Sequence, residues 1–293
     1  MVPPQAVIRK AVVPATIEPA RYWNTYVAYF VNVLRAGGVE VELKGHSGDE
    51  LCGRGLFRVE LDGRPAVVDY SDHKDCAPCT EPGLPRFKFS YSTALRRPSE
   101  GEATVFPFTP ISFMDWDQYE RMKAEVHYGA GDRILYMQTA HKGTDNYDRR
   151  RLVQRIIPEA FGDRADNRML PLEDYWRAIN TALVRVFAPG TRNDMLDRGQ
   201  AQHFAFGCCT ISPVLDVVLP YWMMPKAHVD YVRCASDYSN LVRLIDLCSE
   251  PRNRSGLQAV GRNAQALFEH TSTPPRLVRW LALCMEQYYA HHG

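Results

Sequence analysis

Apolar side chains recur at helical spacing near the start of the chain. Within residues 22–34, aromatic and aliphatic residues return every three or four positions, which predicts a helix that ends at Gly37 and Gly38. Residues 1–20 are rich in proline and are expected to be extended. Residues 39–43 alternate strictly between apolar and polar, which predicts a strand directly after the helix.

Alternation continues in the segment that follows. Residues 57–61 alternate, and Asp62 and Gly63 then turn the chain into residues 65–69. An Asp-Gly pair between two such runs is a strong hairpin signal, so we expect a β-hairpin here. Residues 87–91 alternate again and predict a further strand.

Short apolar runs alternate with helical patterns in the second half of the chain. We expect strands at 133–138, 182–187, 208–212 and 229–233, and helices at 147–161, 172–181, 200–206 and 238–248. A regular succession of strand and helix favours a parallel sheet with helices on both faces. The fold class predicted from this pattern is α/β.

The length of 293 residues suits two domains. A polar helical pattern at 115–126 is followed by a break at 129–132, and we place the domain boundary there. The expected division is an N-terminal α/β domain at 1–128 and a second domain at 129–275. Residues 276–293 are amphipathic and are expected to form a helix that packs back across the two domains.

Charge and cysteine usage narrow the functional classes. The chain has 35 Lys and Arg against 34 Asp and Glu, so it lacks the basic excess of proteins that coat nucleic acid or anionic membranes. No apolar run approaches the roughly 20 residues that span a bilayer, and the cytoplasm is the expected compartment. The adjacent Cys208 and Cys209 are interpreted as small buried hydrophobes. His73 near Cys76 and Cys79 lacks the second ligand pair of a structural zinc site, so no metal is expected.

Three polar loops follow predicted strands of the second domain, where an open α/β sheet binds its ligands. The first loop contains Thr139 and His141 and leads into three arginines, 149–151, at a predicted helix start. Arginines at that end oppose the helix dipole unless an anion lies nearby. They therefore indicate either phosphate binding or ion pairs with Asp145 or Asp148.

The second and third loops carry glycines at places where a ligand could approach the backbone. Gly190 permits close approach, Thr191 can cap a helix, and Arg192 is placed to meet a diphosphate. In the third loop, Gly207 joins a predicted helix to the strand at 208–212.

Residues 202–213 read Gln-His-Phe-Ala-Phe-Gly-Cys-Cys-Thr-Ile-Ser-Pro. This run resembles the helix–Gly–Cys–strand element of GT-B glycosyltransferases, and it is most similar to the exostosin-like and protein O-glucosyltransferase groups. Residues 216–220, 228–241 and 254–268 are similar to segments that follow this element in those groups. The resemblance covers about 133–270, and it implies two Rossmann-like domains that face a central cleft (GT-B-like).

In that family the C-terminal domain binds a nucleotide-sugar donor. The resemblance implies a glycosyltransferase in which Arg150 and Arg192 or Arg198 hold the diphosphate and Gln202 lies near the ribose. A UDP-sugar is the expected donor, and neither a cofactor nor a metal is expected. The expected donor-binding residues are Thr139, His141, Arg149, Arg150, Gly190, Thr191, Arg192, Arg198, Gln202 and Gly207.

Glycosyl transfer also needs a base for the acceptor hydroxyl. The candidates are Asp69, Asp72 and His73, which follow the second strand of the predicted hairpin. The alternative is that Asp69 and Asp72 only shape the loop as turn residues.

Several functions remain open from sequence. The acceptor could be a glycan, a protein, a small molecule or a modified nucleic-acid base. One alternative is a non-catalytic, Rossmann-like nucleotide-binding protein, and another is an unrelated α/β enzyme such as a ligase or an oxidoreductase. No Gly-x-Gly-x-x-Gly follows a predicted strand and no Walker lysine is present, which counts against the last class.

Overall fold

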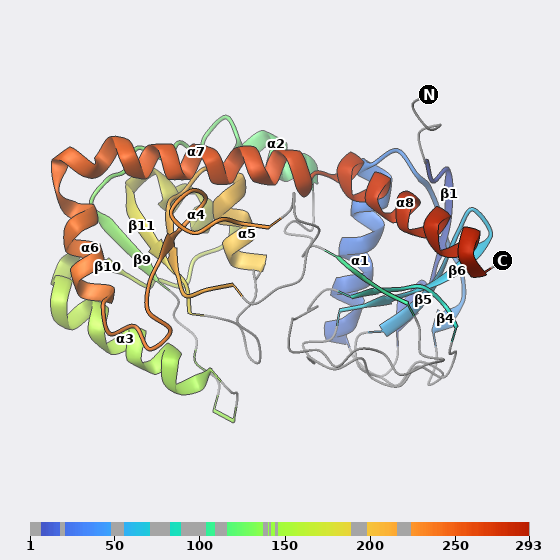
Figure 1. Ribbon diagram of the computed structural model, residues 1–293, viewed down its shortest axis with the longest axis horizontal. Coiled ribbons are helices and arrows are strands. Elements are labelled where there is room, and N and C mark those ends of the chain that lie inside the picture. Colours follow the sequence, from blue (N-terminus) through green and yellow to red (C-terminus); the bar gives the residue numbers. More distant parts are fainter. Residues whose placement is uncertain are drawn as a thin grey trace. The chain divides into compact units, whose positions relative to one another are not determined.

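The chain folds as an α/β protein with two compact units, each described here by itself (Figure 1). The structure is a computed structural model, and it describes residues 7–17, 21–47, 56–70, 83–88, 104–108, 116–136, 140, 142–143, 146–188, 198–215 and 224–292. Unit 1 contains Met1–Trp116 and Thr271–Gly293, and unit 2 contains Asp117–Val217 and Tyr221–His270. The boundary expected from sequence was at 128/129.

Unit 1 is built on a mixed sheet with the strand order β3-β1-β5-β6-β7-β8. Its strands are β1 (Lys10–Val13), β3 (Glu40–Leu43), β5 (Leu56–Leu61), β6 (Arg64–Asp69), β7 (Arg86–Lys88) and β8 (Val105–Pro107). β5 runs antiparallel to both of its neighbours, and the remaining pairs are parallel. A separate parallel pair is formed by β2 (Thr16–Ile17) and β4 (His46–Ser47).

The predicted hairpin is confirmed as β5 and β6. Asp62 and Gly63 connect the strands with positive φ angles of 50° and 76°, as a two-residue turn with the twist of a hairpin requires. The Asp62 carboxylate also accepts backbone N–H bonds from Arg9 (3.0 Å) and Lys10 (2.8 Å). This turn therefore anchors the start of β1 as well as joining β5 to β6.

Two helices pack together in unit 1. The predicted first helix is confirmed as α1 (Arg21–Ala36), and its residues Phe30 and Leu34 are fully buried. The C-terminal helix α8 (Pro274–His292) lies against α1, where a β-carbon at Gly37 would overlap the side chain of Val278. The indole of Trp280 donates a 2.8 Å hydrogen bond to the carbonyl of Pro107. The C-terminal helix was expected to pack back across both domains. In the structure, α8 belongs to unit 1.

Unit 2 contains a fully parallel sheet with the strand order β10-β9-β11-β12-β13. Its strands are β9 (Arg133–Tyr136), β10 (Ala165–Asp166), β11 (Ala182–Val186), β12 (Thr210–Ser212) and β13 (Val232–Arg233). Numbered along the chain, these strands take the order 2-1-3-4-5, which is one of the common doubly wound orders. The predicted α/β class with a parallel sheet is confirmed, and the winding reverses between β9 and β11.

The helices of unit 2 connect and cover this sheet. They are α2 (Trp116–Met122), α3 (Tyr147–Phe161), α4 (Leu172–Arg177), α5 (Arg198–Ala205), α6 (Leu241–Ser249) and α7 (Arg254–Thr271), with 3-10 turns at Gly162–Arg164, Ala178–Thr181 and Pro251–Asn253. Val184 and Val186 of β11 pack in a core cluster with α3 and α6. Arg185 and Phe187 alternate with them and therefore point to the other face, which carries α4 and α5.

Three predicted elements of unit 2 begin later than expected, and one of them is the strand expected at 208–212, which begins at Thr210. The strand expected at 229–233 is limited to Val232–Arg233, because His228 has a φ of 62° and the Asp230 carboxylate accepts the Lys226 N–H, which together make a turn. The helix expected at 238–248 begins at Leu241, because Tyr238 has a φ of 59°, outside the right-handed helical region. No helix in the described part of the chain is long and apolar enough to cross a membrane.

Candidate functional site

Much of the expected site lies outside the described residues. This applies to Asp72, His73, Thr139, His141, Gly190, Thr191 and Arg192, and also to Cys76 and Cys79. Arg198 is the first residue of α5, but its side chain is not among those described. The expected site residues that the structure does describe are Asp69 in unit 1 and Arg149, Arg150, Gln202 and Gly207 in unit 2.

Arg149 and Arg150 lie in the first turn of α3, the helix that follows β9. Arg149 Nη1 donates a 3.3 Å hydrogen bond to the side chain of Asn146, and the Arg150 N–H donates to the Asn146 carbonyl at 3.0 Å. Arg150 is buried although it is charged, with 7% of its surface exposed. Asp148, in the same turn, is exposed.

A cavity of about 390 Å³ lies along the same half of α3. Asp148, Arg151, Leu152, Gln154 and Arg155 line it. Two arginines and one carboxylate give the lining of this cavity a net positive charge. The start of α3 therefore offers positive charge both on its buried side and on its outer side.

Gln202 is buried in α5 and is bonded to an aromatic residue. Its Oε1 accepts a 3.2 Å hydrogen bond from the indole Nε1 of Trp176, which is fully buried. Gln200, two residues earlier, donates to the Thr210 hydroxyl at 3.4 Å. The face of the sheet that carries α5 thus contains a buried polar layer, of which Gln202 is one member.

Gly207 lies in the turn after α5 and has a φ of 68°, a conformation that favours glycine. A β-carbon there would lie 3.2 Å from Gln265 of α7. Gly207 was expected to let a ligand approach the backbone. The structure shows that it lets α7 of the same unit approach the backbone.

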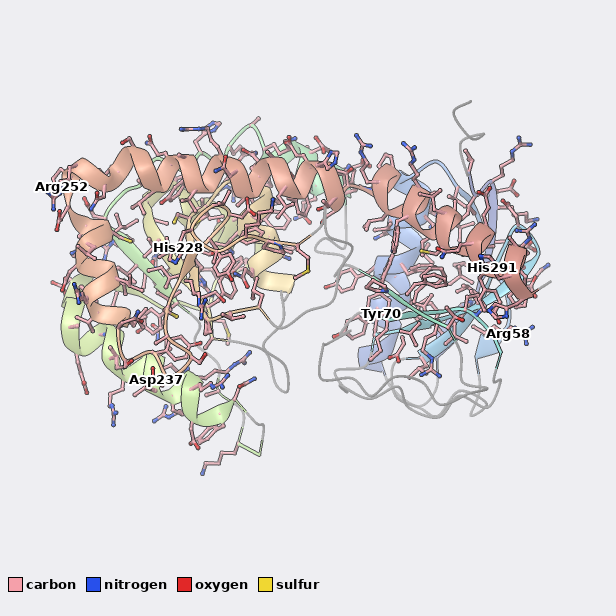
Figure 2. The ribbon with its side chains drawn as sticks, in the orientation of Figure 1. Arg58, Tyr70, His228, Asp237, Arg252 and His291 are labelled. Atoms are coloured by element: carbon pink, nitrogen blue, oxygen red, sulfur yellow. The ribbon has the colours of Figure 1, made fainter. Side chains whose placement is uncertain are left out.

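Asp69 lies at the end of β6 in a buried group of charges. Lys88 Nζ is 3.3 Å from one of its carboxylate oxygens, and Arg86 Nη1 is 3.9 Å from the other. Lys88 and Arg86 both belong to β7, whose Lys88 pairs in register with Asp69. The neighbouring Tyr70 is also buried in unit 1 (Figure 2) and stacks on Tyr26 with ring centroids 5.0 Å apart.

This environment defines what Asp69 can do chemically. The fully buried Asp69 carboxylate lies within ion-pair distance of the Lys88 ammonium and of the Arg86 guanidinium. To accept a proton from a substrate, it would have to give up an ion pair with Lys88. The assignment of Asp69 as a base therefore stays a prediction.

The sequence analysis missed Arg185, a buried arginine in the centre of the unit 2 sheet. Its guanidinium carbon lies 5.3 Å from the ring centroids of both Tyr175 and Phe187, and 7% of the residue is exposed. Its Nε is buried and has no hydrogen-bond partner among the described residues. One signal was available, since Arg185 is the only charged residue within the apolar run 182–187.

His203 lies against the same two rings and is fully buried. Its ring centroid is 5.1 Å from that of Tyr175 and 5.5 Å from that of Phe187. Burial, together with the positive charge of Arg185, lowers the pKa of His203 to about 3. His203 is therefore neutral at pH 7.

The cysteines of this region are buried, as expected. Cys208 and Cys209 are fully buried between α5 and β12, and burial raises the pKa of both thiols. In the described part of the chain, no three His, Cys, Asp or Glu side chains are grouped to hold a metal ion.

No protein-family model matches the chain, and no curated protein matches it. Among solved structures, the chain is similar to sucrose-phosphate synthase from Thermosynechococcus elongatus, with 13% sequence identity and a TM-score of 0.40. The similarity covers 65% of this chain and 54% of that one, so the chain spans about half the length of that protein. At this TM-score the fold class rests on the strand order of unit 2 and not on the similarity.

Proposed function

We propose that the protein is a glycosyltransferase that moves a sugar from a nucleotide-sugar donor, a UDP-sugar, to an acceptor. Arginines would balance the charge of the departing diphosphate, so that no metal is needed. The acceptor would be a glycan, a protein, a small molecule or a modified nucleic-acid base.

The observation that carries this proposal is the helix start next to the reversal point of the unit 2 sheet. The winding reverses between β9 and β11, and sheets of this order bind ligands beyond the carboxyl ends of those strands. α3 follows β9, and its first turn contains Arg149 and Arg150. Guanidinium groups at a helix N-terminus add to the attraction of its N–H groups for phosphate.

The second support comes from the connection between β11 and β12. The sequence between β11 and α5 includes Gly190, Thr191 and Arg192, and we propose that this loop approaches the diphosphate. α5 continues with Gln202, which we propose as a contact near the ribose, and Gly207 lies in the turn after the helix. Gly190, Thr191 and Arg192 follow the carboxyl end of β11, whereas Gly207 directly precedes the amino end of β12.

The proposed reaction also needs a base for the acceptor hydroxyl. Asp69, Asp72 and His73 are the candidates from sequence. Because Asp69 is paired with Lys88 at 3.3 Å, we favour Asp72 and His73, which follow it along the chain.

Binding of the donor can be tested by thermal unfolding. A panel of UDP-, GDP-, ADP- and CMP-sugars should raise the Tm for one nucleotide, because a ligand that binds only the folded state stabilises it. Arg192→Ala should abolish that shift. Arg252→Ala is the matched control, because Arg252 is exposed at the corner between α6 and α7 (Figure 2) and pairs only with Glu250 among the described residues.

A second experiment, hydrolysis of the donor, distinguishes an enzyme from a non-catalytic binding protein. A transferase should slowly hydrolyse its donor when no acceptor is present, whereas a non-catalytic nucleotide-binding protein should leave the donor intact. If no nucleotide raises the Tm, the glycosyltransferase proposal is wrong.

A further inference from the structure

Arg185 occupies an unusual position for a charged side chain. It lies on the central strand β11, and it pairs in register with Leu135 of β9 and Thr210 of β12. The residue is thus one position before the carboxyl end of a strand at the reversal point of the sheet. Ligands of doubly wound sheets bind near that end.

The charge of Arg185 is only partly compensated within the described residues. Among them, no carboxylate lies within ion-pair distance of its guanidinium. The faces of Tyr175 and Phe187, each 5.3 Å away, attract the cation but accept no N–H···O bond. The buried Asp166 lies on the same face of the sheet, but it is paired with Arg168 at 2.8 Å.

His203 adds an unused acceptor to the same cluster. Its Nδ1 is 2.9 Å from the carbonyl oxygen of Gly199, and because a carbonyl can only accept, Nδ1 carries the proton. The neutral ring then has an unprotonated Nε2. This atom is buried and has no hydrogen-bond partner in the part of the chain that the structure describes.

A buried donor and a buried acceptor without partners are both costly, at about 1–3 kcal/mol each in proteins. Here they occur together, since Arg185 and His203 contact the same pair of rings. A ligand that supplies an anionic oxygen to the arginine and a hydroxyl to the histidine would satisfy both groups at once.

We infer that Arg185 and His203 form a binding site for an anionic oxygen group, phosphate or carboxylate, whose ligand also donates a hydroxyl hydrogen bond to Nε2 of His203. Arg185 is not completely enclosed, since 7% of the residue remains exposed. Candidate ligands are sugar phosphates, hydroxy acids and uronic acids. The inference goes beyond the proposed function, because the site would bind such a group whether or not the protein transfers a sugar.

The hydroxyl requirement makes the site selective between simple anions. Inorganic phosphate near pH 7 always keeps at least one P–OH group, because its third proton is lost only far above this pH. Sulfate has no hydroxyl at this pH. His203 Nε2 can therefore accept a hydrogen bond from phosphate but would face the lone pairs of sulfate.

Binding is best measured by calorimetry on the full chain at pH 7 with phosphate, sulfate, glucuronate and neutral glucose as probes. We expect phosphate or glucuronate to bind and glucose not to bind. Phosphate alone would identify a phosphate ligand, and glucuronate alone a carboxylate ligand. Arg185→Met, which keeps an unbranched apolar side chain without the guanidinium, should weaken binding of the anion at least tenfold, whereas the exposed control Arg252→Met should leave it unchanged.

The role of His203 is tested by comparing the affinity of the chain for phosphate with its affinity for sulfate. Phosphate should bind wild type at least tenfold more tightly than sulfate. His203→Phe should reduce that preference by weakening phosphate, and His203→Gln, which can present an amide oxygen, should retain part of it. An equal affinity for phosphate and sulfate in wild type would overturn the role of His203.

If the Arg185 variants fail to fold, the wild-type chain can be observed directly. The Nε–H resonance of Arg185 should shift when phosphate or glucuronate is added. No binding of either anion, or unchanged binding in Arg185→Met, would overturn the inference and leave the cluster as a structural feature. The two proposals fail separately: anion binding that survives Arg185→Met contradicts only this site, and anion binding without any nucleotide shift contradicts only the glycosyltransferase.

Discussion

Gly261 of α7 lies directly against Gly207, which lies in the turn after α5. A β-carbon at Gly261 would overlap the carbonyl oxygen of Gly207 and would lie 3.1 Å from the ring of Tyr128. Two glycines distant in sequence thus allow a helix to pack on the turn between α5 and β12. This contact lies at the amino end of β12, at the opposite edge of the parallel sheet from the start of α3.

Gly261→Ala should therefore destabilise the protein. Overpacking of a tight site costs about 1–3 kcal/mol, because the backbone of Gly207 cannot rotate away as a flexible side chain could. Urea unfolding measures the change. Gly256→Ala is the matched control in the same helix: a β-carbon there meets nothing within 4 Å, and it should stabilise by about 0.5–1 kcal/mol. Equal effects of the two substitutions would contradict the packing.

Asp69→Asn should destabilise unit 1 strongly. Removal of one partner from a buried ion pair costs about 3–5 kcal/mol, because Lys88 and Arg86 would remain buried with their charges. Glu42→Gln is the control, since it breaks the exposed pair between Glu42 and Lys10 and should have a much smaller effect. If Asp69→Asn kept its Tm and lost only activity, Asp69 would be the catalytic base instead.

Gln202→Leu should destabilise unit 2 by about 1–3 kcal/mol, because it removes the acceptor used by the buried indole of Trp176. The exposed Gln258 is the control: it donates to the carbonyl of Gly129 at 3.1 Å, and Gln258→Leu should cost less. Nucleotide affinity provides the second measurement. A loss of affinity in Gln202→Leu at a temperature where the variant is fully folded would support the contact with the ribose.

Stability should fall on acidification because of His203. Its pKa is about 3 in the folded chain and 6.5 ordinarily, so between these values the unfolded state binds a proton that the folded state does not. The free energy of unfolding therefore decreases as pH falls below 6.5, by about 1.4 kcal/mol per pH unit. His203→Gln should remove that slope between pH 6 and 4.5. A slope that is the same in wild type and His203→Gln would contradict a buried neutral histidine.

Local patterning predicted the positions of most elements. α3 has the bounds expected from helical spacing, and the hairpin turns at Asp62 and Gly63 as expected. Such features depend on residues a few positions apart, so the sequence contains the information directly. The short strands β8 and β10, of three and two residues, carry no pattern long enough to recognise.

The order of the strands required the tertiary structure. Alternation of strand and helix predicted a parallel sheet in unit 2, but it does not distinguish the order 2-1-3-4-5 from other doubly wound orders. That order places the winding reversal between β9 and β11. The start of α3, with Arg149 and Arg150, is a candidate binding site because α3 follows β9, one of the two strands at that reversal.

Sequence by itself determined the α/β class, the hairpin and most helix positions, since these follow from the local spacing of apolar residues and turn residues. Only the tertiary structure shows which polar side chains contact one another. Asp69 joins Lys88 only because β6 and β7 pair in register, and Arg185 shares two rings with His203 only because α4 and α5 cover one face of β11. Contacts of this kind link residues far apart along the chain, and packing of the whole unit, rather than any local pattern, brings them together.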